Sequence, residues 1–333
     1  MSRPTVIVTR ALPAPWLAAL AAECELVIGP AAPPPASAVA GTRFAGRGAW
    51  CDATWSALPR ADAILSLLTE PVDAAVLDAA PRLRVVSNMA VGVDNIDLAA
   101  CAARGIPVGH TPGVLTDATA DLTMALVLAH GRRVLEAADD ARAGRWSTWS
   151  PDGWLGRDLC DATLGIVGWG QIGRAVARRA AGFGLHCLVH SRTPPAPAAG
   201  IEPVGLAALL SRSDIVSLHV PLSPQTRHLV DARALAAMQP HALLVNTSRG
   251  AVVDQDALVD ALRRGVIAGA ALDVTDPEPL PPTHPLFSLP QVLVLPHIGS
   301  ATLGTRRTMA ELAARNVLAA LRGEPLPHAI TRG

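Results

Sequence analysis

The chain has 333 residues, half of them hydrophobic, and its 28 basic and 28 acidic side chains leave no net charge. This length is enough for two domains, each with its own hydrophobic core. A neutral chain without a basic stripe lacks the positive field that nucleic acid or an anionic membrane requires, so we expect a small-molecule ligand. Lysine and tyrosine are absent, which excludes a Schiff-base lysine, a P-loop lysine and tyrosine-dependent acid catalysis.

The five cysteines are scattered and form no CxxC pair, which argues against a disulfide framework and a zinc site and fits a reducing cytoplasm. The first strand-like run, residues 5–9, is too short and too polar for a signal peptide. No later run has the uninterrupted apolar length of a membrane span. We therefore expect a cytoplasmic protein that holds no metal and binds no membrane.

Short apolar runs alternate with Ala- and Leu-rich helical stretches along nearly the whole chain, which predicts βα units, parallel sheets and the α/β fold class. The predicted strands of a first, small doubly wound sheet are Val6–Thr9, Leu26–Ile28, Ala63–Leu67, Val85–Ser87 and Pro107–Gly109. Residues 29–48, rich in Pro, Ala and Gly without a consistent period, predict a surface excursion.

One long helix is predicted from about Asp117 to Ala143, and a last helix from Thr305 to Arg322. Between them lie six predicted strands that suit a dinucleotide-binding sheet: Thr163–Gly168, Leu185–Val189, Ile215–Val220, Ala242–Asn246, Gly269–Asp273 and Val292–Leu295.

The strongest local motif is GxGxxG, which here lies between a strand and a helix as dinucleotide binding requires. Gly168 allows a tight turn, Gly170 lets a pyrophosphate approach the backbone, and Gly173 lets helix and strand pack closely. Gln171 and Ile172 lie in the same loop, where the helix N-terminus offers N–H groups and a positive dipole end. A turn without a ligand is the alternative, but the strand and helix on either side favour the dinucleotide.

The next strand ends in Ser191, Arg192 and Thr193, where an NAD enzyme usually has Asp or Glu against the ribose 2′-hydroxyl. An uncharged residue beside a guanidinium removes repulsion of a 2′-phosphate and adds a partner for it. These residues therefore predict a preference for NADPH over NADH, although a solvated surface arginine is the simpler alternative.

Three polar residues, Arg249, Glu278 and His297, each follow the C-terminal end of a predicted parallel strand, the edge where open α/β sheets bind ligands. Together they suit reduction of a 2-oxo acid. Arg249 would hold the carboxylate and polarise the ketone, His297 would protonate the alkoxide, and Glu278 would keep His297 cationic and oriented. Each has an ordinary structural explanation alone, so their coincidence carries the prediction.

The chain resembles the D-isomer-specific 2-hydroxyacid dehydrogenase family over essentially its whole length, and within it the glyoxylate/hydroxypyruvate reductases. The segments that carry this resemblance are Ser87–Asp97, Thr111–Asp121, Leu272–Pro282 and Leu321–Pro325. It implies reduction of glyoxylate to glycolate or of hydroxypyruvate to D-glycerate. It also implies a flavodoxin-like substrate domain (1–110 with 298–333), a Rossmann cofactor domain (111–297) and a cleft between them.

The resemblance further implies site residues. The backbone N–H groups of Val91 and Gly92 would bind the substrate carboxylate, with Leu68 and Ala90 nearby and Arg249 assisting from the other domain. Unpaired amides of this kind form an anion-binding nest, although a plain strand-to-helix turn is an alternative. The implied cofactor contacts are Thr119, Pro221, Thr247, Asp273, His297 and Gly299.

Three tryptophans lie in the connector of residues 144–156. We expect Trp154 to pack within its own subunit. In the reductases that this chain resembles, the residue matching Trp149 reaches across a homodimer to the partner's active site, which predicts a homodimer here.

Two other functions remain open at this stage. The first is phosphoglycerate dehydrogenase, a similar enzyme that often carries an extra regulatory domain. Formate dehydrogenases usually have Gln where Glu278 stands, and D-lactate dehydrogenases often use a tyrosine that this chain lacks, so both are less similar. A nucleotide-sensing corepressor of the same fold would keep the three catalytic-type residues, so only turnover separates that binding protein from an enzyme.

Overall fold

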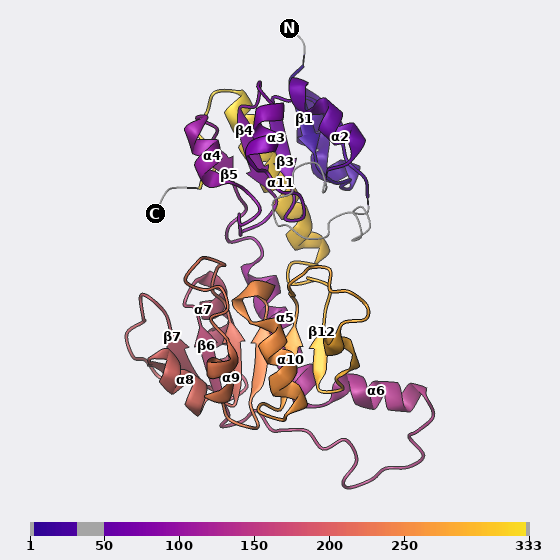
Figure 1. Cartoon of the computed structure of the whole chain (residues 1–333), viewed down its shortest axis with the longest axis vertical. Helices are drawn as coiled ribbons and strands as arrows, with labels where there is room; N and C mark the ends of the chain where they lie inside the picture. Colours follow the sequence, from indigo (N-terminus) through magenta and orange to yellow (C-terminus); the bar gives the residue numbers. More distant parts are fainter. Residues whose placement is uncertain (1–2, 32–49, 331–333) are drawn as a thin grey trace. The chain divides into compact units, whose positions relative to one another are not determined.

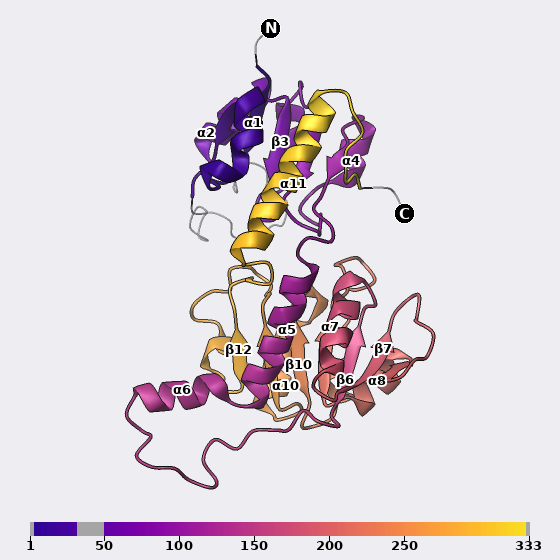
Figure 2. The same ribbon diagram turned by 180° about the vertical axis from the view of Figure 1, so that it is seen from behind.

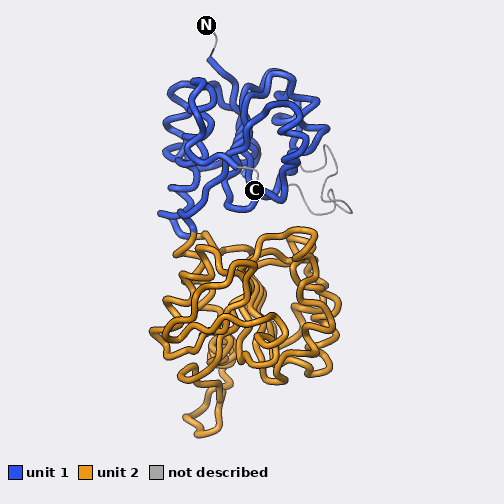
Figure 3. The backbone as a smooth tube through the Cα atoms, turned by 90° about the vertical axis from the view of Figure 1, so that its left-hand side faces the viewer, with its two compact units in different colours: residues 1–115, 302–333 blue, residues 116–301 orange. Residues whose placement is uncertain are grey.

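The computed structural model describes residues 3–31 and 50–330. The chain divides into two compact units, one of residues 1–115 and 302–333 and the other of residues 116–301, coloured separately in Figure 3. Most of the predicted surface excursion at 29–48 lies outside the described residues.

Unit 1 contains a five-stranded parallel sheet with the strand order β2-β1-β3-β4-β5. All five predicted strands are confirmed, as β1 (Thr5–Val8), β2 (Glu25–Ile28), β3 (Ala63–Ser66), β4 (Val85–Asn88) and β5 (Val108–Gly109). The strand order reverses between β1 and β3, and this is the switch point at which open α/β sheets bind ligands.

Helices cover both faces of this sheet (Figures 1 and 2). Side chains alternate between the faces along β1, so that Val6 and Val8 pack towards α11 while Ile7 packs towards α3. The last helix was predicted within two residues of its ends. The helical segments are η1 (Ala14–Leu17), α1 (Ala18–Glu23), α2 (Asp52–Ala57), η4 (Leu58–Arg60), α3 (Ala74–Ala79), α4 (Leu98–Ala103) and α11 (Leu303–Leu321).

Unit 2 contains a seven-stranded parallel sheet with the order β12-β11-β10-β9-β6-β7-β8. Six strands were predicted, and all six are present: β6 (Thr163–Val167), β7 (His186–His190), β9 (Ile215–Leu218), β10 (Leu243–Asn246), β11 (Gly269–Leu272) and β12 (Val292–Val294). The prediction missed the edge strand β8 (Ile201–Pro203), whose three residues end in proline and show no alternation.

The predicted single helix from Asp117 to Ala143 is wrong, because α5 ends at Gly131 and α6 begins at Val134. Arg133 separates them with a left-handed φ of 51°. The spacing of apolar residues continues past this break, but α6 has no buried residue. The helical segments of unit 2 are α5 (Thr116–Gly131), α6 (Val134–Arg142), α7 (Gln171–Ala181), α8 (Leu206–Arg212), α9 (Ala232–Ala236), η5 (Gly250–Val252), α10 (Gln255–Arg263) and η6 (Pro285–Ser288).

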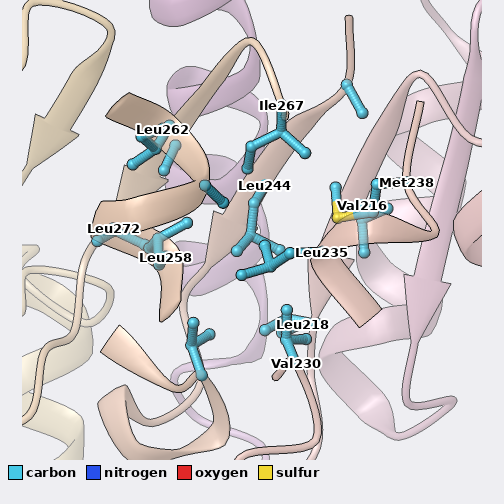
Figure 4. Close-up of a cluster of buried hydrophobic side chains, with 14 of the residues drawn as sticks. Val216, Leu218, Val230, Leu235, Met238, Leu244, Leu258, Leu262, Ile267 and Leu272 are labelled. Carbon is cyan, nitrogen blue, oxygen red and sulfur yellow. The ribbon is translucent and has the colours of Figure 1, made fainter. Parts of the chain in front are cut away.

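Two hydrophobic clusters fix the strands of unit 2 from opposite faces. Figure 4 shows one of them, where Val216 and Leu218 of β9 and Leu244 of β10 meet Leu235 of α9 and Leu258 of α10. On the other face, α5 and α7 pack over β6 and β10. Each fully buried Leu or Val contributes about 1.5–3 kcal/mol. The loops at the strand ends therefore rest on a rigid base.

Among the residues that the structure describes, no helix is both long and apolar enough to cross a lipid bilayer. All five cysteines are described, and all are free thiols.

Candidate functional site

The glycine-rich loop connects β6 to α7, at the point where the strand order of unit 2 reverses. Gly168 has φ = 107°, and a Cβ there would lie 2.6 Å from the carbonyl oxygen of His219. A Cβ at Gly173 would lie 2.1 Å from the Gly168 oxygen, whereas one at Gly170 would meet nothing within 4 Å. Packing therefore requires glycine at both ends of the loop, and the middle is open for a phosphate to approach the N-terminus of α7.

The residues predicted to select the cofactor lie beside this loop. The Gly168 N–H donates to the carbonyl of His190, the last residue of β7, at 2.8 Å. Ser191 follows and is half-buried, while Arg192 and Thr193 are exposed. The end of the second strand is thus adjacent to the loop, as a dinucleotide site requires.

His297 and Glu278 form the hydrogen-bonded pair that the sequence predicted. His297 Nδ1 lies 2.5 Å from Glu278 Oε1, and the two side chains are 23% and 33% exposed. A carboxylate only accepts, so Nδ1 carries the donated proton. Nε2 has no hydrogen-bond partner among the described residues. The pair therefore fixes the ring and leaves Nε2 accessible, so that the imidazolium form, protonated on both nitrogens, can donate the Nε2 proton.

Asp273, which follows β11, holds the loop that carries His297. Its two carboxylate oxygens accept from the N–H groups of Ile298, at 2.7 Å, and Gly299, at 2.8 Å, and its carbonyl accepts from His297 N–H. Burial raises the pKa of Asp273, while those two N–H donors oppose the rise. His297 has a left-handed φ of 53°, a conformation that costs free energy and persists only where neighbouring contacts enforce it.

Arg249 lies in the turn between β10 and η5, and Asn246 braces that turn. Asn246 Nδ2 donates to the Arg249 carbonyl at 2.8 Å, and its Oδ1 accepts from Ser248 N–H at 3.0 Å. A Cβ on Gly250 would lie 2.0 Å from the backbone of Thr275. The turn of Arg249 is therefore in direct contact with the loop that carries Glu278.

The other predicted cofactor contacts lie at the same edge of the sheet. Thr119 of α5 is buried, and its hydroxyl donates to the carbonyl of Gly299 at 3.2 Å. Thr247 follows β10, and its hydroxyl lies 3.1 Å from that of Thr123. Pro221 follows β9. The carboxyl edge of this one sheet thus brings together the glycine loop, the three catalytic candidates and these contacts.

His219, between β9 and Pro221, was missed by the sequence analysis. Its Nε2 lies 2.9 Å from Ser217 Oγ, and burial lowers its pKa to about 4. It is therefore neutral near neutral pH. Its position directly after an apolar strand is the only sequence signal that could have found it.

The predicted substrate residues lie in unit 1, at the carboxyl ends of β3 and β4. Leu68 and Val91 are partly exposed, whereas Ala90 is buried. The carbonyls of Ala90, Val91 and Gly92 all accept hydrogen bonds, while the N–H groups of Val91 and Gly92 have no partner among the described residues. This arrangement fits the anion nest that the resemblance implied.

Two asparagines that the sequence analysis did not single out tie these loops together. Asn88 Nδ2 donates to the carbonyl of Gly92 and to Asn95 Oδ1, both at 2.9 Å. Asn95 Nδ2 donates to the carbonyls of Leu67, at 2.9 Å, and Glu70, at 3.0 Å. Their side chains therefore connect the loop of Leu68 to the loop of Val91.

The tryptophan-rich connector extends from the opposite end of unit 2, beyond α6 (Figure 1). Trp154 Nε1 donates to Asp140 Oδ2 at 2.7 Å, so Trp154 is anchored within its own chain. Trp149 is 79% exposed, and Trp146 and Leu155 are exposed as well. Nothing in the described chain covers this apolar surface.

Comparison with known proteins shows to which family this arrangement belongs. Residues 124–299 match the model of the D-isomer specific 2-hydroxyacid dehydrogenase NAD-binding domain. The chain belongs to the D-isomer specific 2-hydroxyacid dehydrogenases. It is therefore an NAD(P)-dependent dehydrogenase, and the family resemblance seen in the sequence is confirmed.

Relatives of this dehydrogenase cover almost its full length. It is 46% identical to a glyoxylate reductase of Korarchaeum cryptofilum, over 99% of this chain and 96% of that one. It is 44% identical to a glyoxylate reductase of Thermofilum pendens, over 100% of this chain and 96% of that one.

Solved structures agree with the fold. A Thermus thermophilus protein superposes with a TM-score of 0.89 at 45% identity, over 98% of this chain and 100% of that one. A second structure is that of an NADPH-dependent glyoxylate/hydroxypyruvate reductase of Sinorhizobium meliloti in complex with NADP and malonate. It gives a TM-score of 0.83 at 33% identity, over 99% of this chain and 97% of that one.

Proposed function

We propose that this dehydrogenase reduces short 2-oxo acids with NADPH, converting glyoxylate to glycolate and hydroxypyruvate to D-glycerate. The observation that carries the proposal is the Glu278–His297 pair beside Arg249 and the glycine loop, at one edge of a dinucleotide-binding sheet. The names of the relatives support the substrate class.

In the proposed reaction, the N–H groups of Val91 and Gly92 bind the substrate carboxylate, with Leu68 and Ala90 beside it. Arg249 pairs with the same carboxylate and polarises the carbonyl that is reduced. His297 Nε2 donates a proton to the carbonyl oxygen as negative charge develops there. Glu278 accepts from Nδ1 and stabilises the imidazolium before that transfer. Bound NADPH supplies the hydride.

The glycine loop and the end of β7 fit a phosphorylated dinucleotide. Gly168, Gly170 and Gly173, with Gln171 and Ile172, would hold the pyrophosphate at the start of α7. Further cofactor contacts are proposed at Thr119, Pro221, Thr247, Asp273, His297 and Gly299.

For NADPH in particular, the exposed guanidinium of Arg192 would pair with the 2′-phosphate, with Ser191 and Thr193 as uncharged neighbours. The double variant Ser191→Asp/Arg192→Ala should therefore prefer NADH, because it repels the phosphate and removes its partner. Arg263→Ala, which removes an exposed arginine at the C-terminal end of α10 in the same unit, is the matched control and should keep the wild-type preference. Wild-type efficiency with NADH that equals that with NADPH would contradict the assignment.

We also infer a homodimer in which Trp149 enters the partner's active site. The support is the uncovered apolar connector and a cavity of about 820 Å³ at its base, lined in part by Leu135, Leu155 and Leu243. Trp149→Ala should raise KM for hydroxypyruvate and admit bulkier 2-oxo acids, with little change in NADPH affinity. Leu98→Ala, which trims an exposed side chain of unit 1, serves as control. A monomer in sedimentation experiments would refute this inference.

Steady-state kinetics test the proposal as a whole. Glyoxylate, hydroxypyruvate, pyruvate and 3-phosphohydroxypyruvate should be compared with both cofactors, and the glycerate product resolved by chiral chromatography. We expect the highest kcat/KM for glyoxylate or hydroxypyruvate with NADPH, and D-glycerate as the product. A clear preference for 3-phosphohydroxypyruvate would indicate a phosphoglycerate dehydrogenase, and tight cofactor binding without turnover would indicate a nucleotide sensor.

A further inference from the structure

The side chain of His110, at the end of β5, reaches the loop that contains Val91 and Gly92. Its Nδ1 lies 3.0 Å from the carbonyl oxygen of Val91. Because a carbonyl only accepts, Nδ1 must carry the proton of this hydrogen bond. Next in the chain, the Thr111 N–H donates to the carbonyl of Ala90 at 2.9 Å.

These two carbonyls belong to the peptide units that supply the proposed carboxylate-binding N–H groups. The Ala90 carbonyl shares its peptide plane with Val91 N–H, and the Val91 carbonyl shares its plane with Gly92 N–H. In a trans peptide the two groups point in opposite directions, so a donor that fixes the C=O also aims the N–H. A bonded carbonyl also polarises its amide and strengthens the hydrogen bond that the N–H donates.

The backbone of His110 is itself held in place. Its N–H donates to the carbonyl of His328, and its carbonyl accepts from Asn316 Nδ2 on α11, both at 3.1 Å. Asn316 is fully buried. A change of the His110 side chain should therefore leave the course of the chain intact and remove only the bond to Val91.

We propose that His110 is a positioning residue for substrate: its Nδ1–H orients and polarises the Val91–Gly92 peptide so that the Gly92 N–H binds the 2-oxo acid carboxylate. This inference rests on the proposed function, because it takes Val91 and Gly92 as the carboxylate site. His110 does not touch the reacting atoms. Its loss should affect substrate affinity and leave proton and hydride transfer unchanged.

The test compares His110→Ala with His110→Asn. The asparagine Nδ2 occupies nearly the same place as the histidine Nδ1 and can donate to the same carbonyl. For His110→Ala we expect KM for glyoxylate and Kd for oxamate, a non-reacting 2-oxo acid analogue, to rise about 3- to 10-fold, the range of one ordinary hydrogen bond. The kcat and the NADPH affinity should stay near the wild-type values. His110→Asn should restore most of the lost affinity.

His328→Ala is the matched control, since His328 contacts His110 through its backbone carbonyl, and it should behave as wild type. If His110→Ala leaves KM and oxamate affinity unchanged, or if kcat falls with no change in KM, the inference is wrong. Equal weakening in the alanine and asparagine variants would also overturn it, because the donor would then be irrelevant.

Gly92→Pro separates this failure from failure of the proposed function, because proline removes the Gly92 N–H. Thermal melting and NADPH affinity show whether that variant is folded. If folded Gly92→Pro binds oxamate normally, the carboxylate site itself is misplaced and both proposals fall. If it loses oxamate binding while His110→Ala does not, the site stands and only the role of His110 is refuted.

Discussion

Replacing Asp273 with alanine should disable catalysis by releasing the loop that carries His297. The Asp273 carboxylate accepts the N–H groups of Ile298 and Gly299 at 2.7 and 2.8 Å, in a buried position. Hydrogen bonds to a charged group contribute about 1.5–3 kcal/mol each, so their combined loss should cost roughly 3–6 kcal/mol. The left-handed conformation of His297 costs on the order of 1–3 kcal/mol, so the two hydrogen bonds are strong enough to maintain it. His297 would then leave its left-handed conformation.

A displaced general acid transfers its proton poorly, and a displacement of about 1 Å can slow the reaction about 100-fold. Asp273→Ala should therefore lower kcat for NADPH oxidation with glyoxylate by about that factor, together with a fall in the melting temperature. Asp254→Ala is the control, because Asp254 caps α10 by accepting from the Ala257 N–H. Its replacement should lower the free energy of unfolding by about 1 kcal/mol and leave kcat unchanged. Wild-type kcat in Asp273→Ala would refute the role assigned to this carboxylate.

Three further predictions concern other ionisable side chains of unit 2. Arg249→Ala should raise KM for the oxo acid and lower kcat together, because we propose that the guanidinium binds the substrate and stabilises the transition state; steady-state reduction assays would show both, and a change in KM alone would contradict this. Glu278→Gln should lower kcat, because a neutral amide forms a weaker hydrogen bond to His297 Nδ1 than a carboxylate does and holds the ring less firmly; an unchanged kcat would count against the pair. Burial lowers the pKa of His219 to about 4, whereas the pKa of a histidine in an unfolded chain is about 6.5. Stability should thus be complete above about pH 6.5 and decrease by about 2 kcal/mol as the pH falls to about 5. His219→Asn should flatten this dependence in urea unfolding, and an equally steep one would contradict the assignment.

The positions of most strands in the chain could be predicted from the sequence because buried parallel strands form compact apolar runs bounded by turn residues. β8 could not be predicted in this way, because it is a three-residue edge strand that ends in proline and forms no buried apolar run. The break between α5 and α6 could not be seen, because apolar spacing continues through it and the interruption is a single left-handed arginine, Arg133. Arginine carries no sequence signal for that conformation.

The candidate site was predictable where chemistry and position coincide in the chain. Arg249, Glu278 and His297 each follow a strand, and the structure joins two of them in a hydrogen bond. The supporting residues were harder to find. Asn95 and His110 contact loops that come from other strands, and such contacts leave no local pattern in the sequence.

We propose that His297 donates the proton in reduction of a 2-oxo acid, and replacing this side chain tests that role. The most direct measurement is the kcat for NADPH oxidation with saturating glyoxylate, in the wild type and in His297→Ala, with NADPH affinity measured by fluorescence in both. We predict that kcat falls by about two to four orders of magnitude, while the variant still binds NADPH and melts near the wild-type temperature. A His297→Ala enzyme that keeps most of its wild-type kcat would show that His297 is not the proton donor.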